Sequence, residues 1–251
     1  RGLSGLSREV PFTLASIDGG SAMNAIPRSA EAVIVFEAKA AEKVKSWWKE
    51  FSGIVISENS VVEENAFSSC EEAVLPAGTF TPDATRQIIK SLRIMPNGIK
   101  NMNAALPDQV ETSLNFAMIK MTADGVRVTS MQRSSVRSRL IELTQRIEDI
   151  AFLTGAEYKL DVFTEPWQPD WNSPLLKRSK ELWKKIYGED AKVEITHGGL
   201  ECGIIGNLCK GMDTLSMGPD IENPHSPDER LKVSSVGKVF EFLRELLVSY
   251  R

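Results

Sequence analysis

The chain has 251 residues, of which 42% are hydrophobic and 25% are charged, a composition that supports a packed core and excludes a disordered chain. The formal net charge is −4, and Lys and Arg are scattered among Asp and Glu, which argues against nucleic-acid binding. No run approaches the roughly 18 apolar residues of a membrane span, and residues 1–10 lack the apolar centre of a signal peptide. We therefore expect a globular protein without nucleic-acid or membrane partners.

The three cysteines are Cys70, Cys202 and Cys209, an odd and widely spaced set that indicates a reducing compartment and not a disulfide framework. We therefore expect a cytoplasmic protein in which Cys202 and Cys209 are buried structural thiols. The chain has no initiator Met and its first residues run directly toward a predicted strand, so we also expect an incomplete chain.

Alternating apolar residues predict strands over Phe12–Asp18 and Ala30–Glu37, with Gly19-Gly20 in the turn between them. A helix with apolar residues at helical spacing follows and is predicted to end at Gly53. The apolar stretch Ile54–Val62 is predicted as the next strand. The predicted order is strand, strand, helix, strand.

The same order recurs after a connecting helix that Thr81-Pro82 is suited to cap. Glu111–Met121 and Val126–Gln132 are predicted to form a hairpin, the next helix ends at Gly155, and Glu157–Phe163 is the closing strand. We therefore predict an α+β first part made of two strand-strand-helix-strand halves.

A proline-rich stretch, Glu165–Asp170, breaks the periodicity and predicts a boundary between a first domain, 1–165, and a second, 166–251. Beyond it the order becomes helix, strand, helix, strand, helix, with strands at Val193–Thr196 and Thr214–Met217. This alternation is typical of part of a parallel sheet with crossover helices, so the predicted fold class is α/β. The last helix is predicted to begin at Ser234 and to bury one apolar face, made of Val236, Val239, Phe240, Leu243, Leu246, Leu247 and Tyr250.

The two histidines, His197 and His225, each follow one of the short predicted strands of the second part. In open parallel sheets ligands bind beyond the carboxyl ends of the strands, so neighbouring strands would bring both imidazoles to one cleft; two surface-loop histidines are the alternative. Prolines bracket His225, and Asp228 and Glu229 follow it, a rigid and acidic setting that suits a zinc-bound imidazole. For the two carboxylates themselves we favour solvated surface charges.

Polar groups stand at the ends of further predicted elements. Gly198 and Gly199 precede a helix, where backbone N–H groups can hold a substrate carboxylate. Asn24 follows the first turn, and Arg133 ends a strand with a guanidinium that can bind a carboxylate bidentately; a solvated surface Arg is the alternative. A catalytic pair of Cys202 with a histidine stays open but ranks below metal chemistry.

The chain contains six short motifs: Asn24–Arg28, Pro96–Gly98, Val110–Asn115, Trp167–Asp170, Gly199–Gly203 and Pro224–Glu229. In order and spacing these motifs resemble the aminoacyl-histidine dipeptidases, also called cytosol non-specific dipeptidases, of the carnosinase-like zinc peptidases. The resemblance extends from about Leu14 to the C-terminus and corresponds to the C-terminal half of these enzymes.

The resemblance implies a lid domain over residues 1–165 that closes on a dipeptide, and the C-terminal part of a catalytic zinc domain over 166–251. It implies that His225 is a zinc ligand. It also implies substrate contacts for Asn24 and Arg133 in the lid, and for the loop that holds His197, Gly198 and Gly199.

The family's other metal ligands and its general base match nothing in this chain. The resemblance therefore implies a zinc-dependent dipeptidase for Xaa-His and other dipeptides, with two zinc ions in the complete site and manganese or cobalt as alternatives, and with this chain alone inactive. A homodimer through the lid is expected. The alternative function is a catalytically inactive, lid-derived dimerisation or binding module.

Overall fold

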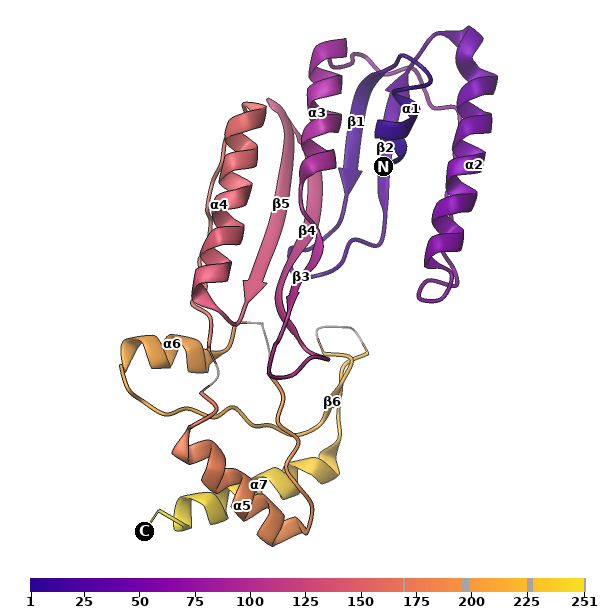
Figure 1. Cartoon of the computed structure of the whole chain (residues 1–251). Helices are drawn as coiled ribbons and strands as arrows, with labels where there is room; N and C mark the ends of the chain where they lie inside the picture. The colour runs from indigo at the N-terminus through magenta and orange to yellow at the C-terminus, as the bar shows by residue number, and fades with distance from the viewer. Residues whose placement is uncertain (169, 196–198, 225–227, 251) are drawn as a thin grey trace. The chain divides into compact units, whose positions relative to one another are not determined.

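The computed structural model describes residues 1–168, 170–195, 199–224 and 228–250 (Figure 1). The chain divides into two compact units. The first unit comprises residues 1–99, 113–132 and 142–159, and the second comprises residues 100–112, 133–141 and those from 160 onward. The predicted boundary between residues 165 and 166 stays a prediction.

A five-stranded sheet has the order β2-β1-β4-β3, with β5 also paired to β4. Its strands are β1 (Thr13–Gly19), β2 (Ala30–Val35), β3 (Gly98–Met102), β4 (Val110–Thr122) and β5 (Gly125–Ser134). β1 and β2 are antiparallel, and a bulge between Leu14 and Ser16 shifts their register before Gly19 pairs with Ala30. The α/β class with an α+β first part is confirmed.

Four α-helices accompany this sheet: α1 (Gly2–Leu6), α2 (Ala41–Asn59), α3 (Pro82–Ile94) and α4 (Arg137–Thr154), with a 3-10 turn, η1 (Ala38–Ala40), before α2. Leu6, Val10 and Val44 form one buried cluster where α1 contacts α2. Leu14 and Ile17 of β1 form another with Ile119 of β4. The core of the first unit therefore joins segments that are far apart in the sequence.

The start of β1 is hydrogen bonded to α3 and to the residues just before α3. The backbone N–H of Leu14 donates to Thr85 Oγ1 at 3.0 Å, and the N–H of Phe80 donates to the carbonyl of Leu14 at 2.8 Å. The predicted cap of α3 is formed, because Thr81 Oγ1 accepts from the N–H of Ala84 at 3.2 Å. These bonds satisfy both backbone groups of Leu14.

The closing strands predicted for the two halves are not formed. α2 continues through Gly53 to Asn59, so most of 54–62 is helical, and 157–163 has no strand. A single glycine costs a helix only about 1 kcal/mol, and packing of Val44 and Trp47 of α2 in the cluster with Leu6 offsets it. Each half is therefore strand, strand, helix. The short helix α1 was not predicted.

In the second unit, α5 (Pro174–Tyr187), α6 (Glu201–Leu208) and α7 (Val233–Val248) accompany a two-stranded antiparallel sheet of β6 (Ile221–Glu222) and β7 (Arg230–Leu231). The predicted caps of α5 are confirmed: Ser173 Oγ accepts from the N–H of Leu176 at 2.9 Å, and Gly188 ends the helix with φ +74°. Asp213 strengthens this start by accepting from the Ser173 hydroxyl at 2.7 Å.

α5 and α7 contact each other and cross at an angle (Figure 1). Trp183 of α5 meets Phe242 of α7 edge to face, with ring centroids 5.2 Å apart. Of the face of α7 that was predicted to be buried, only Leu246 is buried and Val239 is partly buried, so the prediction is wrong for the rest. Phe242, which was not predicted, is buried, whereas Phe240 is 69% exposed. The apolar residues extend around α7, so spacing alone did not decide which face meets α5.

The strands predicted at 193–196 and 214–217 are not formed in their described residues, 193–195 and 214–217. A short apolar segment becomes a strand only when a neighbour completes its hydrogen bonds, and none does so among the residues described. The parallel sheet predicted for the second part stays a prediction.

Candidate functional site

His197, Gly198 and His225 lie outside the described residues, so their predicted convergence stays a prediction. Asn24, Arg133 and Gly199 are described. Asn24 belongs to the first unit, and Arg133 and Gly199 belong to the second. The contacts around each of these residues show what holds its backbone in place.

Asn24 lies exposed in the loop 20–29 between β1 and β2. The N–H of Gly20 donates to the carbonyl of Ser29 at 3.2 Å and closes the base of this loop. From β4, Asn115 Nδ2 donates to the carbonyl of Met23 at 3.2 Å and to that of Ala25 at 2.7 Å. The backbone on both sides of Asn24 is therefore bonded to the sheet.

Gly20 brings the same loop against β4. Its φ is +70°, and a Cβ built on it would lie 1.9 Å from the carbonyl oxygen of Ala117. Only glycine adopts this φ without strain and leaves room for such a close backbone approach. The predicted Gly19-Gly20 turn is thus also a packing contact between the loop and β4.

Arg133 is partly buried near the end of β5, and side-chain hydroxyls fix the residues beside it. The Thr112 and Ser134 hydroxyls are hydrogen bonded at 2.8 Å, and Ser134 Oγ accepts from the N–H of Val136 at 3.0 Å. The N–H of Ser135 donates to the carbonyl of Glu111 at 3.0 Å. The strand end that carries Arg133 is therefore bonded to β4.

Glu111 is a buried carboxylate behind this strand end, with 7% of its surface exposed. Its Oε1 accepts from Arg139 Nη1 at 2.6 Å and from Thr112 Oγ1 at 3.2 Å. A buried carboxylate needs such partners, because an unpaired charge away from water is costly. These bonds make Glu111 a structural link between β4 and α4.

Gly199 lies exposed just before α6. A Cβ on Gly199 would lie 2.8 Å from Thr164 Cγ2, so the glycine permits a close approach of the two segments. Leu200, the N-cap residue of α6, provides no side-chain hydrogen bond to the first turn. The role of Gly199 in binding a carboxylate stays a prediction.

The described residues contain no group of three or more His, Cys, Asp or Glu side chains that could hold a metal ion. His225 lies outside the described residues, and its role as a metal ligand stays a prediction. The prediction of buried thiols is wrong for Cys209, which is exposed, and Cys202 is only partly buried. Cys209 is the C-cap residue of α6, and apolar neighbours in the chain do not ensure burial at a helix end.

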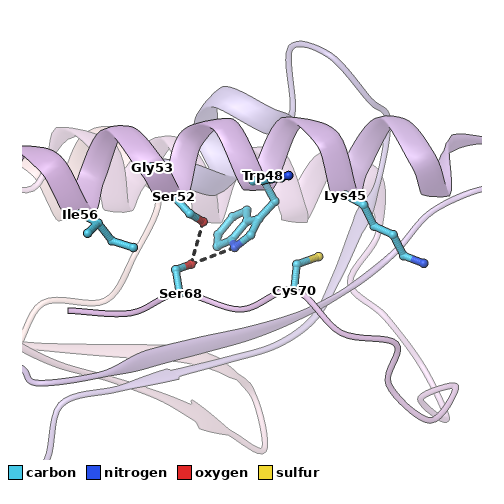
Figure 2. A pocket seen from close by; sticks show the side chains of 8 residues that line it. Lys45, Trp48, Ser52, Gly53, Ile56, Ser68 and Cys70 are labelled. Carbon is cyan, nitrogen blue, oxygen red and sulfur yellow. Dashed lines mark hydrogen bonds between the residues drawn. The ribbon is translucent and has the colours of Figure 1, made fainter. Parts of the chain in front are cut away.

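A hollow of about 420 Å³ lies between α2 and the segment with Ser68 and Cys70 that runs beside it (Figure 2). Ser68 accepts from Trp48 Nε1 at 2.9 Å and lies 3.0 Å from Ser52 Oγ. The hydrogen bond with Glu72 raises the pKa of Lys45, which lines the hollow. Of the predicted site residues that the structure describes, none lines this hollow.

Within the described ranges, no helix is long and apolar enough to cross a membrane. Residues 3–62 match the profile of a family described as "Peptidase dimerisation domain". Over 247 residues the chain is 31% identical to the "Cytosol non-specific dipeptidase" of Escherichia coli (strain K12), covering 98% of this chain and 51% of that protein. The chain thus spans about half the length of this relative.

Among solved structures, the aminoacylhistidine dipeptidase from Vibrio alginolyticus matches with a TM-score of 0.87 and 29% sequence identity. The match covers 98% of this chain and 50% of that chain. The relative found by sequence and the relative found by structure are therefore both named as dipeptidases.

Proposed function

The chain is a homologue of the aminoacyl-histidine dipeptidases over about half of their length, and from this we propose that the complete protein is a cytoplasmic dipeptidase that uses zinc. Xaa-His and other dipeptides are the proposed substrates. The observation that carries the proposal is the 31% identity to a named dipeptidase across 98% of the chain. Identity spread over the whole chain supports more than a shared fold.

His225 is proposed as one metal ligand, in a site that residues from outside this chain would complete. When bound, zinc would polarise the scissile carbonyl and lower the pKa of a bound water. A catalytic zinc site uses about three protein ligands, and the described residues contain no such group.

Arg133, Asn24, His197, Gly198 and Gly199 are proposed to bind substrate. A guanidinium suits the C-terminal carboxylate of a dipeptide, because its planar fork offers parallel donors to both oxygens. The bonds from Thr112 and from the N–H of Ser135 to the neighbouring strand support this role, because they hold the backbone beside Arg133.

Replacement of His225 by alanine in the full-length protein is expected to lower kcat/KM for a Xaa-His dipeptide by at least about 100-fold, because a missing ligand weakens metal binding and activation. Activity with added zinc or manganese and bound metal by elemental analysis are the measurements. Cys209→Ser, at an exposed thiol, is the control and is expected to retain activity. Full activity and full metal content in the His225 variant would exclude it as a ligand.

A second function, homodimerisation, is favoured by the match of residues 3–62 to a peptidase dimerisation domain. β2 ends the strand order β2-β1-β4-β3, and its residues Ala30, Glu31 and Ala32 are exposed. An unpaired strand edge offers N–H and C=O groups to another chain. We propose that β2 pairs with β2 of a second copy.

Ala32→Lys is expected to shift the 251-residue chain from dimer toward monomer, since a lysine on an edge strand opposes pairing with another strand. Size-exclusion chromatography with light scattering measures the mass. Asn101→Lys, on exposed β3 at the other end of the strand order, is the matched control and should stay dimeric. A wild-type monomer, or equal effects of both variants, would contradict pairing through β2.

A further inference from the structure

The amide of Asn115 joins β4 to both sides of Asn24. Its Nδ2 donates to the carbonyls of Met23 and Ala25, which are the residues immediately before and after Asn24. An asparagine amide carries two N–H donors on one nitrogen, so a single side chain can satisfy both carbonyls. The residue between them is thereby held while its own side chain stays exposed.

The donor itself is fixed by the core of the first unit. Its neighbours on β4 are closely packed, with Leu114 2% exposed and Ala117 fully buried. The N–H of Phe116 donates to Asn97 Oδ1 at 2.9 Å, which ties this part of the strand to the turn before β3. Asn115 therefore projects from backbone that has little freedom to move.

We infer that Asn115 is a positioning residue that presents Asn24 to the dipeptide. The inference rests on the proposed function, because it needs Asn24 to contact substrate. A loop of ten residues, 20–29, closed only at its base would let Asn24 sample many positions, and ordering it on binding would weaken affinity. The two amide bonds to the loop carbonyls remove much of that freedom before substrate arrives.

The first test measures the loop without reference to activity. Asn115→Asp keeps the shape of the side chain but replaces the donor by an oxygen that repels both carbonyls. Hydrogen exchange of the loop amides in the 251-residue chain is expected to speed up by at least about tenfold in this variant and in Asn115→Ala. Asn101→Ala, on exposed β3, is the control and should leave the loop unchanged.

The second test measures kinetics in the full-length protein. Asn115→Asp and Asn24→Ala are each expected to raise KM for a dipeptide by about tenfold with a smaller change in kcat, since both lose binding to the substrate. The double variant should be no worse than Asn24→Ala alone, because Asn115 acts through Asn24.

Unchanged hydrogen exchange in the Asn115 variants would overturn the inference, whatever the activity. Effects on KM that add in the double variant would also overturn it, because Asn115 would then act independently of Asn24. A wild-type protein without dipeptidase activity would instead contradict the proposed function. Loop exchange would in that case still report whether Asn115 holds residues 23–25, so the two failures are distinguishable.

Discussion

Replacement of Gly20 by alanine is expected to lower the free energy of unfolding of the 251-residue chain by about 4 kcal/mol. Gly20 has a φ of +70°, a region that costs other residues roughly 1–2 kcal/mol. The added Cβ would lie 1.9 Å from the carbonyl oxygen of Ala117, which belongs to β4 and cannot rotate away. Either β1 and β4 separate there or the loop leaves the strand, and both outcomes lose buried contacts.

Urea unfolding measures this change, and Gly53→Ala is the matched control. Gly53 lies inside α2, and a Cβ there would have no heavy atom within 4 Å. That substitution is expected to stabilise the chain by about 0.5–1 kcal/mol, because alanine favours helix more than glycine does. Equal effects of the two substitutions would contradict the close approach of Gly20 to β4.

Replacement of Phe242 by alanine is expected to cost about 3–5 kcal/mol, measured by urea unfolding and by hydrogen exchange in α5 and α7. Phe242 is 4% exposed, and its ring meets that of Trp183 at an interplanar angle of 69°. Truncation to alanine removes the buried apolar area of the Phe242 ring and its edge-to-face contact with Trp183, and it leaves a cavity between α5 and α7.

Phe240 on the same helix provides the control for Phe242. It is 69% exposed, so Phe240→Ala removes little packing within the second unit and is expected to change stability by less than about 1 kcal/mol. If Phe240→Ala destabilised the chain more than Phe242→Ala, the face of α7 that meets α5 would be the one expected from the sequence and not the one described here.

Local signals in the sequence predicted the structure correctly where all the interacting residues lie within one short stretch of chain. The caps at Thr81 and Ser173, the glycine end of α5 at Gly188 and the hairpin at Gly125 each depend on residues within a few positions of one another. The same holds for the six motifs, whose resemblance to the aminoacyl-histidine dipeptidases is confirmed by the relatives found.

Local sequence patterns predicted only part of the candidate site. Asn24 was identified after the first predicted turn and Arg133 at the end of a predicted strand, but the side chains that hold the backbone beside them were not assigned this role. Asn115 lies about 90 positions from the loop it binds, and Thr112 lies 22 positions from Ser134. No local pattern indicates which polar side chain of a strand will meet a distant backbone.

The amino-acid sequence by itself determined the class of fold, most helices and hairpin strands, and the relationship to dipeptidases. Only the tertiary structure decided that α2 continues through Gly53, that Phe242 and not Phe240 faces α5, and that Asn115 and Gly20 seat the Asn24 loop on β4. Helix ends, caps and turns depend on neighbours in the chain, whereas buried faces and closing strands depend on which distant surface packs against them.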